Sequence, residues 1–250
     1  MRLKTGGVMA FGLALILSGS ARADTSAKAM EIVDKAIEAH GGEAEMKKLS
    51  SNSMKMKGTV HVMGMEIAFM GDTSSQEFAR RRVDLEMEVA NQKFRIVNVF
   101  NKDKGWAKVN DQVTEMTKDQ VAGAVDQAHS NWVASLLPLK DKAYTLSLVG
   151  EGKVGTTPVL VITVTRKDRR DVNLSFDKKT HLLLKVETRV KDEQSGEEKT
   201  EEAFFSDYND KGLKQPKKIT VNRDGKLFVE AEVSDLRVDE KFDESVFGKP

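Results

Sequence analysis

Hydrophobic residues recur at helical spacing near the start of the chain. Met30, Val33 and Ile37 lie three and four residues apart, and Gly41 and Gly42 follow them. Apolar side chains at this spacing form one face of a helix, and glycine often ends a helix because it accepts a left-handed conformation. The pattern therefore predicts an amphipathic helix over about residues 26–40.

The same spacing returns in the middle of the chain, over residues 117–137. The apolar positions of this stretch are Val121, Val125, Ala128, Trp132 and Leu136. Pro138 follows, and proline cannot continue a helix. The pattern predicts a second amphipathic helix. Such a helix either fills a core or caps a cavity for an apolar ligand, and both interpretations stay open.

Elsewhere the hydrophobic period is two. Met54, Met56, Val60 and Val62 alternate with polar residues, and further segments up to about residue 236 do the same. This alternation predicts strands with one apolar and one polar face. Short turns such as Asp224–Gly225 separate the segments. We expect about eleven antiparallel strands in a meander, which curls at this size.

The first 23 residues have the pattern of a secretory signal peptide. Arg2 and Lys4 precede an apolar run, Val8 to Leu17, and the segment ends in the small residues around Arg22. The run of about ten residues is short of the roughly 20 needed to span a bilayer. We predict a signal peptide over residues 1–23, cleaved near Ala23, and one exported domain over residues 24–250; an N-terminal membrane anchor is the alternative.

Composition and motifs narrow the possible functions. The chain has 40 basic and 39 acidic residues and no cysteine. The chain has no concentrated basic segment that would predict nucleic-acid binding. Because it has no cysteine, it can neither form a disulfide nor use a catalytic thiol. The four histidines share no ligand spacing, and no catalytic or metal motif occurs. We therefore expect no enzyme, no cofactor and no metal site. Arg80, Arg81 and Arg82 point alternately in a strand and are expected at a solvated edge.

Methionine is abundant in the predicted first strands. The chain has 11 methionines, six of which lie between Met54 and Met87. Methionine is flexible and polarizable, and it adapts to irregular apolar partners. A methionine-rich face would suit acyl chains of varied shape. The alternative is that these residues only fill gaps in a core.

Several segments combine into a recognisable pattern. The carboxyl half contains a Phe-Asp-x-x-Thr turn and apolar strand (FDKKTHLLLKVETRV, 176–190), a Ser-Asp-Tyr segment leading to Pro216, an Asp-Gly-Lys turn (224–226) and the ending FDESVF (242–247). The amino-terminal part contains HGGEAEMKKLSS (40–51) and KMKGTV (55–60). In this combination the mature chain resembles the outer-membrane lipoprotein-sorting proteins, the LolA-like family.

The resemblance implies a fold and a function. The implied fold is a mainly β, incomplete (half-open) antiparallel barrel with an N-terminal helix and a central lid or plug helix. The implied function is a monomeric periplasmic carrier that holds lipid or lipoprotein acyl chains in an apolar cavity. Its partners would be an inner-membrane donor complex and an outer-membrane acceptor. The alternatives are an envelope lipid sensor that signals to a partner protein and an enzyme with an unfamiliar site.

We select the candidate ligand-contacting residues by strand face and helix position, not by alignment. The lid candidates lie on or beside the central helix: Val125, Trp132 and Leu136. The wall candidates lie on the apolar faces of the first strands: Met56, Val60, Ile67, Phe69, Leu85 and Met87.

Overall fold

One antiparallel sheet dominates the computed structural model, which describes residues 17–192 and 196–250, with side chains from Asp24 onward. Within these residues the sheet has 13 strands in the order β6-β5-β4-β3-β2-β1-β13-β12-β11-β10-β9-β8-β7. The strands are β1 (Ser51–Val62), β2 (Met65–Gln76), β3 (Arg80–Val89), β4 (Gln92–Asn101), β5 (Lys104–Val109), β6 (Gln112–Glu115), β7 (Tyr144–Val154), β8 (Thr157–Arg166), β9 (Val172–Asp177), β10 (Leu183–Lys191), β11 (Glu198–Tyr208), β12 (Pro216–Arg223) and β13 (Lys226–Val238).

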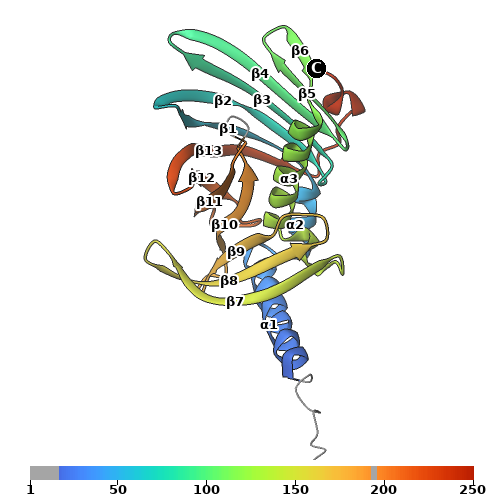
Figure 1. Ribbon diagram of the computed structural model, residues 1–250, viewed down its shortest axis with the longest axis vertical. Helices are drawn as coiled ribbons and strands as arrows, with labels where there is room; N and C mark the ends of the chain where they lie inside the picture. Colours follow the sequence, from blue (N-terminus) through green and yellow to red (C-terminus); the bar gives the residue numbers. More distant parts are fainter. Residues whose placement is uncertain (1–16, 193–195) are drawn as a thin grey trace, which may run out of the picture.

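The sheet is curled but open, as Figure 1 shows. Its edges, β6 and β7, are the ends of the strand order. Pairing of β1 with β13 joins the amino-terminal meander to the carboxyl-terminal one. The predicted half-open antiparallel barrel is confirmed, with 13 strands in place of about eleven.

Three α-helices and three short 3-10 helices accompany the sheet in the described residues: α1 (Leu17–Ala39), α2 (Glu43–Lys47), α3 (Lys118–Ala134), η1 (Lys48–Ser50), η2 (Leu137–Lys140) and η3 (Glu244–Phe247). The first predicted helix is present but begins earlier, at Leu17. Of the predicted signal peptide, residues 1–16 lie outside the described residues and residues 17–23 belong to α1. None of the described helices is both long and apolar enough to cross a bilayer.

The start and end of α3 follow from local chemistry. Thr117 accepts a hydrogen bond from the backbone N–H of Gln120, and the Gln120 side chain accepts one from the N–H of Thr117. This reciprocal capping box satisfies two of the free N–H groups at the start of a helix. The helix ends at Ala134, two residues before Leu136, whose φ of 62° is left-handed, and Pro138 follows in η2. The predicted range, residues 117–137, agrees with this helix to within three residues at each end.

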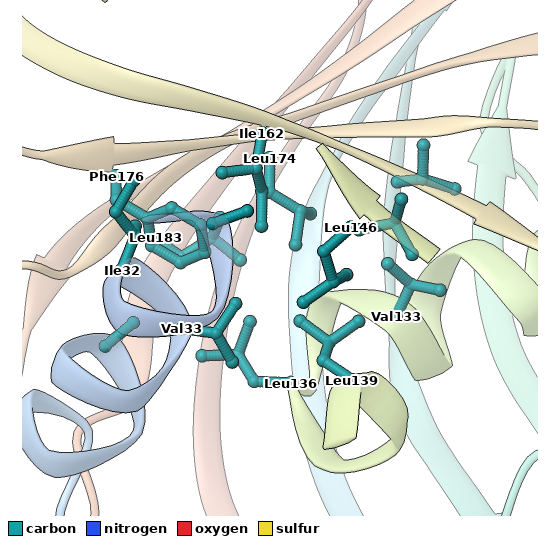
Figure 2. Packing of buried hydrophobic residues seen from close by; sticks show 14 of the residues in the cluster. Ile32, Val33, Val133, Leu136, Leu139, Leu146, Ile162, Leu174, Phe176 and Leu183 are labelled. Carbon is teal, nitrogen blue, oxygen red and sulfur yellow. The ribbon is translucent and has the colours of Figure 1, made fainter. Parts of the chain in front are cut away.

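The main hydrophobic core lies between α1, α3, η2 and strands β7–β10. Figure 2 shows side chains of α1, such as Ile32 and Val33, facing Ile162 and Phe176 of the sheet. Leu139 of η2 closes the core from the other side, and all of these residues are buried. Full burial of one such side chain contributes about 1.5–3 kcal/mol. The core therefore fixes α1 and the end of α3 against the β7–β10 end of the sheet.

A smaller core lies on the opposite face of the sheet. Phe247 of η3 packs on Val97 and Val99 of β4, with Phe242 and Trp106 beside it. The C-terminal segment thus covers part of the outer face. The inner face near β1–β4 keeps no comparable cluster of buried residues among those that the structure describes.

Candidate functional site

One continuous apolar face crosses most of the sheet. Residues paired directly across neighbouring strands point to the same side. The pairings connect one apolar residue on each of nine strands, from β2 through β1 and β13 to β7: Ile67, Val60, Val229, Val221, Ala203, Val186, Leu174, Ile162 and Leu148. We call this side the inner face.

The inner face has a packed half and an open half. On β8–β10 its residues Ile162, Leu174 and Val186 belong to the main core. On β1–β4, which we call the open half, the apolar residues are mostly only half-buried. Near the strand tips, Met65 of β2 and Val109 of the adjacent strand β5 are each 47% exposed. The structure thus shows an open apolar face where the resemblance implied a cavity.

All six wall candidates lie on the open half. The pairs Val60–Ile67 and Phe69–Met87 place four of them on the inner face. Met56 and Leu85 both pair with Gly71, which puts them on the same side. Of the six, only Phe69 is fully buried. Sequence alternation therefore brought these residues to one face, and their contact with a ligand stays a prediction.

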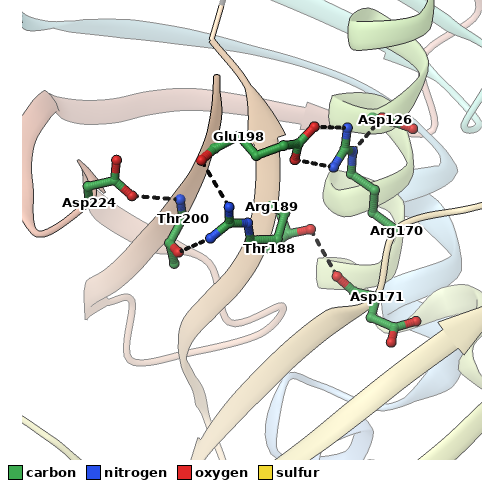
Figure 3. A network of polar contacts seen from close by, with 8 residues as sticks. All are labelled: Asp126, Arg170, Asp171, Thr188, Arg189, Glu198, Thr200 and Asp224. Atoms are coloured by element: carbon green, nitrogen blue, oxygen red, sulfur yellow. Dashed lines mark hydrogen bonds and ion pairs between the residues drawn. The ribbon is translucent and has the colours of Figure 1, made fainter. Parts of the chain in front are cut away.

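Helix α3 bridges the two ends of the curled sheet. It meets β5 at one end and β9 and β10 at the other, and Figure 1 shows it running along one side of the sheet across both halves. Arg170 fixes it there, as Figure 3 shows. The guanidinium donates to Asp126 of α3 at 2.8 Å and to both carboxylate oxygens of Glu198 on β11, at 2.5 and 2.8 Å. The bonds to Glu198 and then Asp126 raise the pKa of Arg170 above its ordinary value.

A second contact of α3 centres on His129. Its ring stacks on Tyr144 of β7, with ring centroids 5.9 Å apart, and meets the edge of Phe78 in the β2–β3 turn. The guanidinium of Arg169 lies over the Phe78 ring, 5.9 Å from its centroid. His129 is 1% exposed. Burial, and then the positive charges of Arg166 and Arg169, lower its pKa to about 4.

The three lid candidates occupy different surroundings. Val125 and Trp132 lie on α3 and are half-buried. Leu136 lies beyond the helix and belongs to the main core, where it is 1% exposed. Between α3 and β10–β11 the structure leaves a cavity of about 30 Å³, which holds no more than a water molecule. The cavity beneath this part of α3 is therefore too small for an acyl chain.

Arg81 is the unexpected member of the open half. On β3 it points to the same side as Val83, Leu85 and Met87, and its cross-strand partners are Ser75 and Phe100. Its Nε atom is buried and has no hydrogen-bond partner among the described residues. Burial lowers the pKa of Arg81 from its ordinary value. The expected solvated edge is wrong for this residue, because β3 lies inside the sheet.

A separate hollow lies beside α1. It has a volume of about 530 Å³ and is lined by charged residues, with Lys140 bonded to Asp34 at 2.9 Å and to Glu43 at 3.6 Å. Its lining holds three carboxylates and two lysines, and Lys140 forms ion pairs with two of the carboxylates. In the described part of the chain, no group of three or more His, Asp or Glu side chains is arranged to hold a metal ion.

A curled, half-open antiparallel sheet with an apolar inner face and a helix across its ends defines the class of LolA-like folds, and comparisons with known proteins agree. No protein-family model and no curated protein matches the chain. Among solved structures, a LolA superfamily protein from Nitrosomonas europaea matches with a TM-score of 0.56 and 15% identity, over 88% of this chain and 97% of that one.

Two further structures match equally well. One is described as an outer membrane lipoprotein-sorting protein domain from Vibrio parahaemolyticus, with a TM-score of 0.55, 14% identity, and coverage of 90% and 97%. The other is a DUF1329 family protein from Desulfovibrio piger, with a TM-score of 0.54, 14% identity, and coverage of 88% and 96%. The fold of this chain is therefore LolA-like, as the sequence resemblance implied.

Proposed function

We propose that this protein is a periplasmic carrier that holds the acyl chains of lipids or lipoproteins on the open half of its inner face. One observation carries the proposal: an apolar face continuous with the core is left half-exposed over β1–β4. Soluble proteins rarely expose large apolar patches unless these bind something. The LolA-like fold and the methionines of β1–β3 support the same function.

The energetics of acyl chains explain why such a carrier is needed. Each methylene removed from water contributes about 0.8 kcal/mol, so a free acyl anchor does not cross an aqueous compartment unaided. An open face can accept chains of different number and shape and release them again. We further propose export through a leader over residues 1–23, uptake from an inner-membrane donor complex and delivery to an outer-membrane acceptor.

The first test is native mass spectrometry of the protein purified gently from the periplasm. We expect a chain that begins near Asp24, with an additional mass equal to a phospholipid or an acylated peptide. A chain of full length in the membrane fraction would contradict export in soluble form. A mass without any bound lipid, together with no uptake of added lipid, would contradict the carrier function.

Two methionines on opposite faces of the sheet provide a matched pair of variants. Met87 lies on the open half, whereas Met70 of β2 lies on the outer face and is 59% exposed. We expect Met87→Gln to weaken the binding of a fluorescent acyl probe about three- to tenfold, because it places an amide where methylenes bind. Met70→Gln should leave the probe affinity unchanged. Equal losses of probe affinity in the two variants would mean that the ligand does not bind on the open half.

A further inference from the structure

One end of the open half carries a polar residue, as the inner face of strand β3 shows. Along the inner face of β3, Arg81 is followed by Val83, Leu85, Met87 and Val89 at every second position. Arg81 lies where the chain enters α3, because its partner Phe100 pairs in turn with Gly105 and Met116 packs over Gly105. The apolar residues lead away from it toward the β3–β4 tip. The positively charged Arg81 therefore lies at one end of a row of apolar side chains.

The positive charge of Arg81 has no counter-charge in the structure. Within the described residues, Arg81 makes no hydrogen bond or ion pair, and its inner-face neighbours Ser75, Thr73 and Asn98 are all uncharged. Arginine does not lose its proton in proteins, so it cannot relieve its burial by becoming neutral. A partly buried cation without a partner is costly, and an anion is the group that relieves it.

The next residue, Arg82, shows that an unpaired guanidinium is not a general property of the three consecutive arginines. Arg82 points to the outer face, where it bonds to Asp84 at 3.1 Å, and Asp84 also bonds to Arg95 at 2.8 Å. Arg82, unlike Arg81, thus has a carboxylate partner. Around His129, Arg166 and Arg169 likewise form no ion pair among the described residues.

We propose that the carried molecule is an anionic amphiphile whose carboxylate or phosphate head binds Arg81 while its acyl tail lies along Val83, Leu85 and Met87. The inference rests on the proposed carrier function and specifies its cargo. The dimensions fit: from Arg81 to Val89 the strand spans about 27 Å, at roughly 3.4 Å per residue. One leaflet of a bilayer core, and hence one acyl tail, measures about 15 Å. Ser75 and Asn98 supply further hydrogen-bond donors beside the head.

The test compares ligands that share a tail and differ in the head. Dodecanoic acid, dodecyl phosphate and neutral dodecanol each compete with the neutral fluorophore N-phenylnaphthylamine for the purified protein. Charge-assisted hydrogen bonds predict that both anions bind about 10- to 100-fold more tightly than dodecanol. Arg81→Gln should reduce both anions to the affinity of dodecanol, and Arg81→Lys should keep most of the preference. Arg82→Gln should keep it fully.

Each other outcome has a distinct meaning. Equal binding of all three ligands by the unaltered protein would overturn the charge-specific inference and leave the carrier function intact. Equal losses in Arg81→Gln and Arg82→Gln would also overturn it, because only the overall charge would then matter. If inorganic phosphate alone competed as strongly as dodecyl phosphate, the ligand would be a free anion. If no acyl compound bound, the carrier function would fail together with the inference.

Discussion

His129 is a buried base whose protonation opposes folding. It is packed between Phe78 and Tyr144, and Arg166 and Arg169 add positive charge around it, with only Asp126 acting in the opposite sense. Its pKa falls from 6.5 to about 4 on folding. Between these values the unfolded chain binds a proton that the folded chain does not. The free energy of unfolding therefore decreases as the pH falls from 6.5 toward 4.

This linkage gives a measurable pH effect. Between about pH 7.5 and about pH 5, the pKa shift of His129 should remove roughly 2 kcal/mol from the free energy of unfolding. His129→Gln should be less stable at neutral pH, because the ring contacts are lost, but it should lack this part of the pH dependence. Urea unfolding of both proteins at the two pH values measures it. His40, also buried with a lowered pKa, is present in both proteins and cancels from the comparison. Parallel pH profiles would show that His129 does not titrate as described.

At the scale of residues, the sequence predicts well to which face of a strand a side chain points, and poorly how deeply that side chain is buried. Period-two alternation placed Met56 and Met87 on one side, because a strand sends alternate side chains to opposite faces. The same rule puts Arg81 beside Leu85, a signal that was present but outweighed by the charge of three consecutive arginines. The burial of Leu136 was not predictable, since it depends on the left-handed turn that ends α3.

At the scale of elements, two inner-face glycines set the curvature of the sheet. A Cβ added to Gly58 would lie 1.9 Å from the carbonyl oxygen of Glu230, and one added to Gly71 would lie 2.0 Å from that of Asp84. No side chain fits at such a distance from a neighbouring backbone. These glycines therefore allow β1 and β2 to approach their neighbours closely while the sheet bends around α3.

Glycine-to-alanine substitutions in a strand and in the helix should have opposite signs. Gly71→Ala forces β2 away from β3 and should cost about 3 kcal/mol of unfolding free energy. Gly123 lies in α3, and nothing lies within 4 Å of a Cβ added to it. Gly123→Ala should stabilise the protein by about 0.5–1 kcal/mol, because alanine loses less backbone freedom in a helix. Chemical denaturation of both variants decides the matter; a neutral Gly71→Ala would mean that the sheet curves for another reason.

The elements themselves were largely readable from the sequence. Long strands and α3 carry strong periodicity, and their turns carry the expected glycine, asparagine or aspartate. The helix α2 and the C-terminal η3 were missed, because five and four residues are too few to show a helical period. Phe242 and Phe247, which are five residues apart, give no alternation that would have revealed the small outer core.

At the scale of the whole molecule, α3 compensates for the open edges of the sheet. The order of the strands leaves β6 and β7 unpaired with each other, so the curled shape is not closed by backbone hydrogen bonds. The number of strands predicts that the sheet curls. It does not predict how α3 links the two halves of the curled sheet, because this link depends on contacts between distant segments. Asp126 and Glu198, joined by Arg170, lie 72 residues apart in the chain.

The link through Arg170 predicts how α3 moves. In Figure 3, Arg170 connects α3 to β11, whereas Arg189 bonds to Thr200 and to the backbone oxygen of Glu198 without contacting α3. Because these contacts are partly exposed, Arg170→Gln should leave the protein folded. It should, however, speed amide hydrogen exchange in α3 about two- to fivefold, since local opening needs less free energy once the link is removed. Arg189→Gln should leave exchange in α3 unchanged. If neither variant changed the exchange of α3, the helix would be held by the main core and the His129 stack alone. If both changed it, the effect would not be specific to the Arg170 link.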